Sequence, residues 1–306
     1  MMLHCRSEVD KRRCCMSKKN IEVQFTEDQL INLYGIQFAI AYADGELDKD
    51  ELRKIFEMMD YSGFSLVGKN KVQAYLFEPP IIDNLINGMM NDISEMKYTA
   101  YMNAIEVAIS NDDISEIQEI ELNKIKEAFN INDIQANKMR EFAIKAKEIA
   151  ERGIDDKYAT DALKSGVAGL GAVGVPIAAV YFSGSIIGLS AAGITGGLSA
   201  VGLGLGMIPG IGVAIVLGAT IFIGLTKFFD VGGKKKKRKH QLQKERRAQL
   251  VIQNLQNTIN MLLDRIEKLE EKTKDVQANK EAIKKLQEVL KSLRQIQNSK
   301  KREAHA

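Results

Sequence analysis

Apolar positions in residues 26–152 recur at helical spacing rather than in alternation, and turn-forming residues interrupt them at short intervals. Three pairs of residues have the spacing of capping boxes, which mark helix starts: Thr26 with Gln29, Asp48 with Glu51, and Ser115 with Gln118. Further helices are expected at about 66–77, 80–90, 94–110 and 132–152. The predicted fold class is therefore all-α. Residues 26–152 show no convincing strand, and the acidic bundle, residues 21–155, is expected to contain about six or seven helices.

A run of 62 residues without a single charge, residues 165–226, interrupts this polar chain and holds 16 of its 24 glycines. Residues 167–189 and residues 207–226 each contain ten Val, Ile, Leu or Phe side chains. Each stretch is long enough to cross a bilayer, which takes about 20 mostly apolar residues. We therefore predict a transmembrane helical hairpin over residues 165–229, with residues 190–206 as its connector.

Small residues within this run follow a period of four. One stripe extends from Gly184 to Gly204 and a second from Gly202 to Gly218. On membrane helices this spacing lets two backbones approach closely, as a glycine zipper. In water each glycine would cost about 1 kcal/mol relative to alanine in a helix interior. A buried apolar core or a flexible glycine-rich linker is the alternative interpretation of the run.

Residues 248–298 show a seven-residue repeat of aliphatic side chains, which predicts a coiled coil. The repeat consists of Ile252, Leu255, Ile259, Leu262, Ile266 and Leu269, followed after an interruption by Ile283, Leu286, Leu290 and Leu293. Such a coil either self-associates, which would make the protein a homo-oligomer, or folds into a hairpin near residues 275–279. The alternative is an amphipathic helix that docks on another domain.

The net charge of +3 conceals opposed blocks of charge. Residues 1–20 carry +4, residues 21–164 carry −13 and residues 227–306 carry +12. The polybasic segment 234–247 follows the uncharged run closely, so we expect it to lie on the cytoplasmic side and to attract a bilayer with anionic headgroups. No aromatic residue is interleaved with the basic ones, which argues against nucleic acid as a partner.

The three cysteines, Cys5, Cys14 and Cys15, all precede Met16. The rest of the chain therefore implies no disulfide framework and fits a reducing compartment. Residues 1–20 lack the apolar core of a signal peptide and are predicted to be a disordered leader. An alternative is that translation begins at Met16.

Two acidic turns, about 65 residues apart, carry the most specific chemistry of the chain. The first is AYADGELDKDE, which begins at Ala41, and the second is AISNDDISEIQEIE, which begins at Ala108. Their recurrence predicts an internal duplication. An EF-hand is excluded, because its loop positions 1 and 3 would fall on Ile40 and Tyr42, where oxygen ligands are required.

A hard divalent cation, Ca²⁺ or Mg²⁺, is nevertheless expected to fit between the two turns if the fold brings them together. The candidate ligands are Asp44, Glu46, Asp48, Glu51, Asp112, Asp113 and Glu121. The alternative is that these carboxylates cap helices and stabilise their positively polarised N-termini.

The turn Ala43-Asp44-Gly45-Glu46-Leu47-Asp48, its Glu51, and the echo before Ile114-Ser115 resemble the tellurite-resistance TerB-like domain. The resemblance covers about residues 26–150 and implies an all-helical, two-lobed bundle of bacterial stress and defence systems. It also implies acidic turns that bind metal and no enzymatic activity. Asp44, Glu46, Asp48 and Glu51 carry over directly, whereas Ser110-Asn111-Asp112 replaces the Ala-Asp-Gly pattern in the second turn.

The sequence contains no catalytic constellation, because its three histidines lie in the leader, the polybasic segment and the tail. The glycine-rich run also lacks the lysine of a phosphate-binding loop. We therefore expect a non-enzymatic, membrane-anchored sensor or scaffold of stress response or defence, whose acidic bundle binds a protein partner or a divalent cation. Its expected place is the inner membrane, with both terminal domains cytoplasmic. The alternative is a pore-forming effector that inserts its glycine-rich hairpin.

Overall fold

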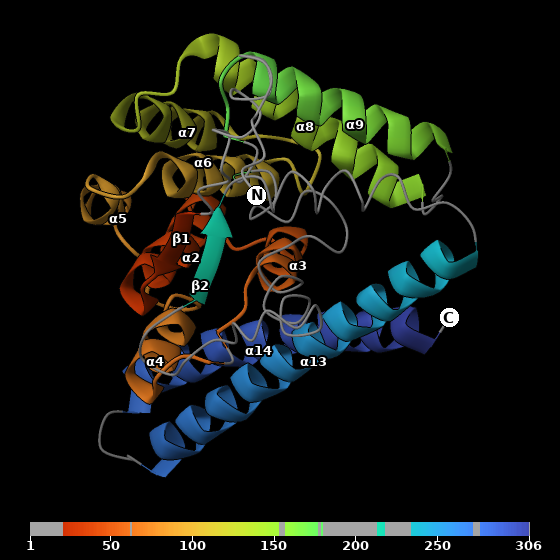
Figure 1. Ribbon diagram of the computed structural model, residues 1–306. Helices are drawn as coiled ribbons and strands as arrows, with labels where there is room; N and C mark the ends of the chain where they lie inside the picture. Colours follow the sequence, from red (N-terminus) through yellow and green to blue (C-terminus); the bar gives the residue numbers. More distant parts are fainter. Residues whose placement is uncertain are drawn as a thin grey trace, which may run out of the picture.

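The computed structural model is built almost entirely from helices (Figure 1). It describes residues 21–61, 63–152, 157–176, 179, 213–217, 234–271 and 276–305. The helices are α2 (Glu27–Ala41), α3 (Lys49–Met58), α4 (Leu66–Ala74), α5 (Ile82–Met89), α6 (Ser94–Ala108), α7 (Glu116–Ala128), α8 (Asp133–Arg152), α9 (Lys157–Ala172), α13 (Lys234–Glu271) and α14 (Val276–His305). Every element described within residues 26–152 is a helix, so the predicted all-α class is confirmed there.

The three predicted capping boxes are present at the helix starts. At the first, the Gln29 N–H donates to Thr26 Oγ1 at 3.2 Å and the Thr26 N–H donates to Gln29 Oε1 at 2.8 Å. The boxes at Asp48 and Ser115 have the same reciprocal bonds. Each box pairs backbone N–H groups that a helix start leaves without a partner, which is why these short local signals locate helices well.

Helices α2 to α4 and α6 to α8 have helix caps at matching spacings, and we call each set of three helices a unit. The caps Asp48 and Ser115 occupy equivalent positions, as do Ser65 and Asn132, each of which accepts from a backbone N–H three residues on. Equivalent residues lie 67 positions apart, as Glu51 and Gln118 do. The first helix of each unit buries eleven residues. The spacing of the helix caps and the pattern of burial support the internal duplication, which stays a prediction from the sequence.

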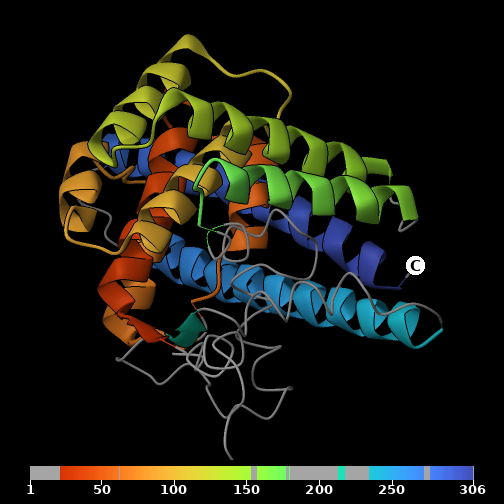
Figure 2. The same ribbon diagram turned by 45° about the horizontal axis from the view of Figure 1, so that its top comes forward.

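One hydrophobic core joins the bundle to the C-terminal helices. The central helices α2 and α6 pack against each other. They contribute Phe38 and Ile105, both fully buried, to the same cluster that contains Leu255 of α13 and Leu293 of α14. Figure 2 shows α13 and α14 lying along one side of the bundle. The two parts that the sequence divides into separate domains thus share one apolar interior.

Helices α13 and α14 pair as an antiparallel hairpin, which is one of the two coiled-coil forms that the heptads predict. Gln297, in the last third of α14, donates to the Ile252 carbonyl at 3.4 Å and to Gln256 Oε1 at 2.9 Å, both near the middle of α13. Leu255, Ile259, Leu262 and Ile266 of the predicted seam are buried. Self-association through this coil stays a prediction.

The apolar run agrees with its prediction in only part of its described residues. We expect a helix over residues 167–189, but α9 starts ten residues earlier and ends at Ala172. Gly174 follows with a φ of 81°, a left-handed conformation that glycine adopts without strain and that stops a helix. No helix of the described residues is long and apolar enough to cross a membrane. Most of the predicted hairpin 165–229, like the leader 1–20, lies outside the described residues.

A short pair of strands lies beside the helices. β1 (Ile21–Phe25) pairs antiparallel with β2 (Val213–Leu217), with Ile21 opposite Leu217 and Phe25 opposite Val213. β2 falls inside residues 207–226, where we expect a helix, so that expectation is wrong for these five residues. Three of the five are β-branched, a side-chain type that fits a pleated strand well.

Candidate functional site

The two acidic turns occupy equivalent places in the two units, between the first helix and the second. Gly45 in the first turn has a φ of 92°, and Asp112, at the equivalent position of the second turn, has a φ of 70°. Glycine enters this left-handed region freely, and aspartate is one of the few other residues that tolerates it. The second turn therefore has the backbone path of the first although its sequence, Ser110-Asn111-Asp112, differs.

The two units meet through the third residue of each capping box. Gln118 Nε2 donates to Glu51 Oε1 at 2.6 Å and to the Ile40 carbonyl at 3.3 Å. The other carboxylate oxygen of Glu51 accepts from the Asp48 N–H at 3.2 Å. Both side chains are 1% exposed. This bridge, defined by Glu51 and Gln118, is a buried polar contact across the internal duplication.

Burial raises the pKa of Glu51 to about 7. The bonds from Gln118 and from the Asp48 N–H favour the ionised carboxylate and oppose this shift, while the nearby charges of Asp44 and Asp48 add to it. Desolvation outweighs the two bonds, because a buried carboxylate loses its hydration when it ionises. Glu51 therefore changes its protonation state near neutral pH, far above the range of an exposed glutamate.

The other carboxylates of the first turn face solvent and make local bonds. Asp44 Oδ1 accepts from the Glu46 N–H at 3.2 Å, and Asp48 Oδ1 accepts from the Asp50 N–H at 2.6 Å. Asp50 in turn forms an ion pair with Arg53. These contacts hold the turn and cap α3, which is the helix-capping role that the sequence left open as the alternative to metal binding.

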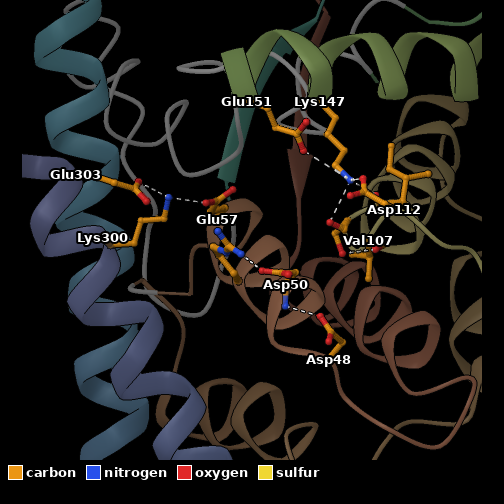
Figure 3. Close-up of polar contacts among 12 residues, drawn as sticks. Asp48, Asp50, Glu57, Val107, Asp112, Lys147, Glu151, Lys300 and Glu303 are labelled. Carbon is orange, nitrogen blue, oxygen red and sulfur yellow. Dashed lines mark hydrogen bonds and ion pairs between the residues drawn. The ribbon is translucent and has the colours of Figure 1, made fainter. Parts of the chain in front are cut away.

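The carboxylates of the second turn are mostly paired with basic side chains (Figure 3). Asp112 forms an ion pair with Lys147, which also donates to the Ile109 carbonyl at 2.6 Å and lies 3.7 Å from Glu151. The Lys147 ammonium thus satisfies a carbonyl at the C-terminal end of α6, where a positive charge is favourable. Glu121 lies 3.1 Å from Lys124.

The predicted ligands do not form a metal centre in the part of the chain that the structure describes. No group of three or more His, Cys, Asp or Glu side chains could hold a metal ion there. The fold brings Glu51 to the second unit, but its partner is the amide of Gln118 and not Asp112, Asp113 or Glu121. Binding of Ca²⁺ or Mg²⁺ by these residues stays a prediction from the sequence.

A second buried polar cluster joins the bundle to α13. The Tyr61 hydroxyl donates to the Asn254 carbonyl at 2.9 Å and lies 2.6 Å from Thr258 Oγ1. Asn254 Nδ2 donates to the Met59 carbonyl at 3.3 Å. Tyr61, Met59, Asn254 and Thr258 are all 1% exposed or less. We call these four residues the tyrosine junction.

Two further contacts join the bundle to the C-terminal helices. Lys300 of α14 lies 2.6 Å from Glu57 of α3 and 2.7 Å from Glu303, as Figure 3 shows. Burial by itself lowers the pKa of the Lys300 ammonium, but the two carboxylates outweigh burial and raise it. Arg265 of α13 stacks 3.9 Å from the centre of the Phe77 ring, a cation–π contact.

Comparison with known proteins leaves the family open. No protein-family model matches this chain, and no curated protein or solved structure is detectably similar to it.

Sequence analysis does not identify the tyrosine junction. The heptad pattern marks the stripe of α13 that faces α14, but Val251, Asn254 and Thr258 form a second buried stripe beside it. Their spacing of three and four residues fits one helix face, which is the only signal that points to them. Asn254 and Thr258 are polar, so a search for periodic hydrophobic residues does not detect them.

We expect the hydroxyls of Tyr61 and Thr258 to be energetically coupled. Tyr61→Phe and Thr258→Val should each lower the free energy of unfolding by about 0.5–1.5 kcal/mol, because each removes buried hydrogen bonds while the remaining hydroxyl still donates to the Asn254 carbonyl. The double variant should cost at least about 0.5 kcal/mol less than the sum of the two. Chemical unfolding of the four proteins measures this coupling. Additive effects would show that the two hydroxyls do not interact in solution.

Proposed function

We propose that this protein is a non-enzymatic scaffold or sensor that the uncharged run, residues 165–226, anchors in a membrane. The supporting observation is that the helices flanking the run belong to one folded body. Leu163 of α9, before the run, packs against the hydrophobic core that contains Leu255 and Leu262 of α13, after it. Val167 and Leu170, at the start of the run, lie in the same core. The run therefore leaves the body and returns to it.

This return limits the topology of an inserted run. A segment whose two ends pack into one core crosses a bilayer an even number of times, because the core lies on one side. The polybasic segment 234–247 favours the cytoplasmic side for that core. Both terminal domains are then cytoplasmic, at the inner membrane. The uncharged run of 62 residues is long enough for two crossings.

The two-unit bundle is the part that we propose to bind a partner. Asp44, Glu46 and Asp113 are exposed, and residues 21–164 carry a net charge of −13, so a basic protein surface is the complementary partner. The resemblance of the acidic turns to the TerB-like domain supports a role in stress response or defence. Within this proposal the bundle is the receptor and the run is the anchor.

We expect the full-length protein to stay in the membrane fraction after a carbonate wash. Ile186→Arg combined with Ile187→Arg, within the uncharged run, should release much of it, because each arginine at the centre of a membrane helix costs about 2.5–3.5 kcal/mol on the insertion scale. Ile117→Arg combined with Ile120→Arg is the matched control, since these isoleucines of α7 are 48% and 61% exposed. The control protein should stay in the membrane.

Recovery of the unmodified protein in the soluble fraction would contradict the anchor. Protease treatment of sealed vesicles tests the topology. The bundle and α14 are proposed to lie on the same side of the membrane, so the protease should cut both or neither. Release of dye from liposomes by the purified protein would favour the pore-forming effector instead, since a passive anchor leaves liposomes sealed.

A further inference from the structure

Positive charge gathers at the open end of the C-terminal hairpin. Residues 234–247 of α13 contain nine basic residues and one acidic residue, and residues 291–302 of α14 contain five basic residues and no acidic one. Antiparallel pairing places the last turns of α14 beside the C-terminal part of residues 234–247, since Gln297 contacts Ile252 and Gln256, which follow that segment. Figure 1 shows the start of α13 and the end of α14 at the same end of the hairpin.

The basic side chains of α14 point away from the core. Lys291, Arg294, Lys301 and Arg302 are exposed, whereas Leu293 and Ile296 between them are buried. The remaining basic residue, Lys300, binds Glu57 of α3 and so fixes this end of the hairpin against the bundle. The result is a rigidly held helix end with a basic outer face.

The opposite end of the hairpin lacks this excess of charge. Residues 264–285, on both sides of the turn, contain seven basic and six acidic residues. The positive charge is therefore a local property of the open end and does not extend along the whole hairpin.

We propose that the open end of the hairpin, formed by residues 234–247 and 291–302, is a docking surface for the anionic headgroups of a lipid bilayer. This inference rests on the proposed membrane anchor, since Lys234 follows the uncharged run after only residues 227–233. Each basic residue close to an anionic bilayer contributes about 1 kcal/mol, and the attraction fades within a Debye length. Residues 234–305 contain no aromatic side chain for base stacking, which favours a bilayer over a single-stranded nucleic acid.

Flotation of the full-length protein with vesicles tests this surface. The double change Lys301→Gln with Arg302→Gln should weaken binding to phosphatidylserine-containing vesicles about 30-fold, and should leave binding to phosphatidylcholine vesicles unchanged. Lys284→Gln with Lys285→Gln removes the same charge from exposed positions of the same helix near the turn, and should have little effect. Circular dichroism checks that both proteins keep their helices.

Equal weakening by the two double variants would overturn the docking surface, because only net charge would then matter. An effect of Lys301 and Arg302 that appears with duplex DNA and not with anionic vesicles would also overturn it. The proposed anchor is tested separately, by the amount of protein that stays in the membrane fraction after a carbonate wash. Removal of the protein from anionic vesicles by salt would contradict the anchor. If that salt-sensitive binding to anionic vesicles still depends on Lys301 and Arg302, it supports the docking surface.

Discussion

Replacing Leu255 with alanine is expected to lower the free energy of unfolding by about 2–5 kcal/mol. Leu255 of α13 is 0% exposed and belongs to the core that α13 shares with the bundle. Alanine loses the transfer energy of the removed methyl groups and leaves a cavity that close-packed neighbours fill only in part. Chemical unfolding followed by circular dichroism measures the change.

Leu263→Ala provides the control for this substitution. Leu263 lies on the same helix, has the same side chain and is 40% exposed, so its truncation should cost under about 1 kcal/mol. The helix propensity of the two changes is the same, and only the tertiary environment differs. Equal losses at the two positions would show that α13 does not pack into the core of the bundle in solution.

The stability of the protein is expected to fall as the pH rises through about 7, because of Glu51. Its pKa is raised from 4.5 to about 7 in the folded chain, so the folded protein binds a proton that the unfolded chain releases between these values. The stabilisation is complete below the unfolded pKa and is lost as the pH rises through the folded pKa. The shift corresponds to about 3 kcal/mol between acidic and mildly alkaline solution.

Glu51→Gln should remove this dependence on pH. Glutamine stays neutral, and its carbonyl oxygen can still accept from Gln118, as Glu51 Oε1 does at 2.6 Å. The stability of the variant relative to the original protein should therefore increase by about 3 kcal/mol between pH values of about 4.5 and 8. Chemical unfolding across this range measures the difference at each pH.

Glu46→Gln is the control for the change in net charge, since it removes an exposed carboxylate from the same turn. A constant difference between Glu51→Gln and the original protein at every pH would contradict a buried, titrating Glu51. The same experiment tests the contact between the two units, because Glu51 and Gln118 connect them.

The sequence by itself determined the helical class, three of the helix starts and the seam of the C-terminal hairpin. These features depend on residues close together in the chain. A capping box needs only a side chain and a backbone N–H three residues apart, as in Asp48 with Glu51. A heptad likewise repeats within one helix, which is why Leu255 and Leu262 are recognisable without a fold.

Only the tertiary structure decided which of these local features meet. Gln118 lies 67 positions from Glu51, and Tyr61 lies 197 positions from Thr258, so no local pattern relates them. The predicted metal ligands are another example. The sequence shows that a turn is acidic, but it does not show which side chains contact the carboxylates. Asp112 pairs with Lys147, 35 positions away, and Glu51 is buried beside an amide. The physical reason is that burial and long-range packing set the environment of a side chain, while short-range spacing sets only its helix and its face.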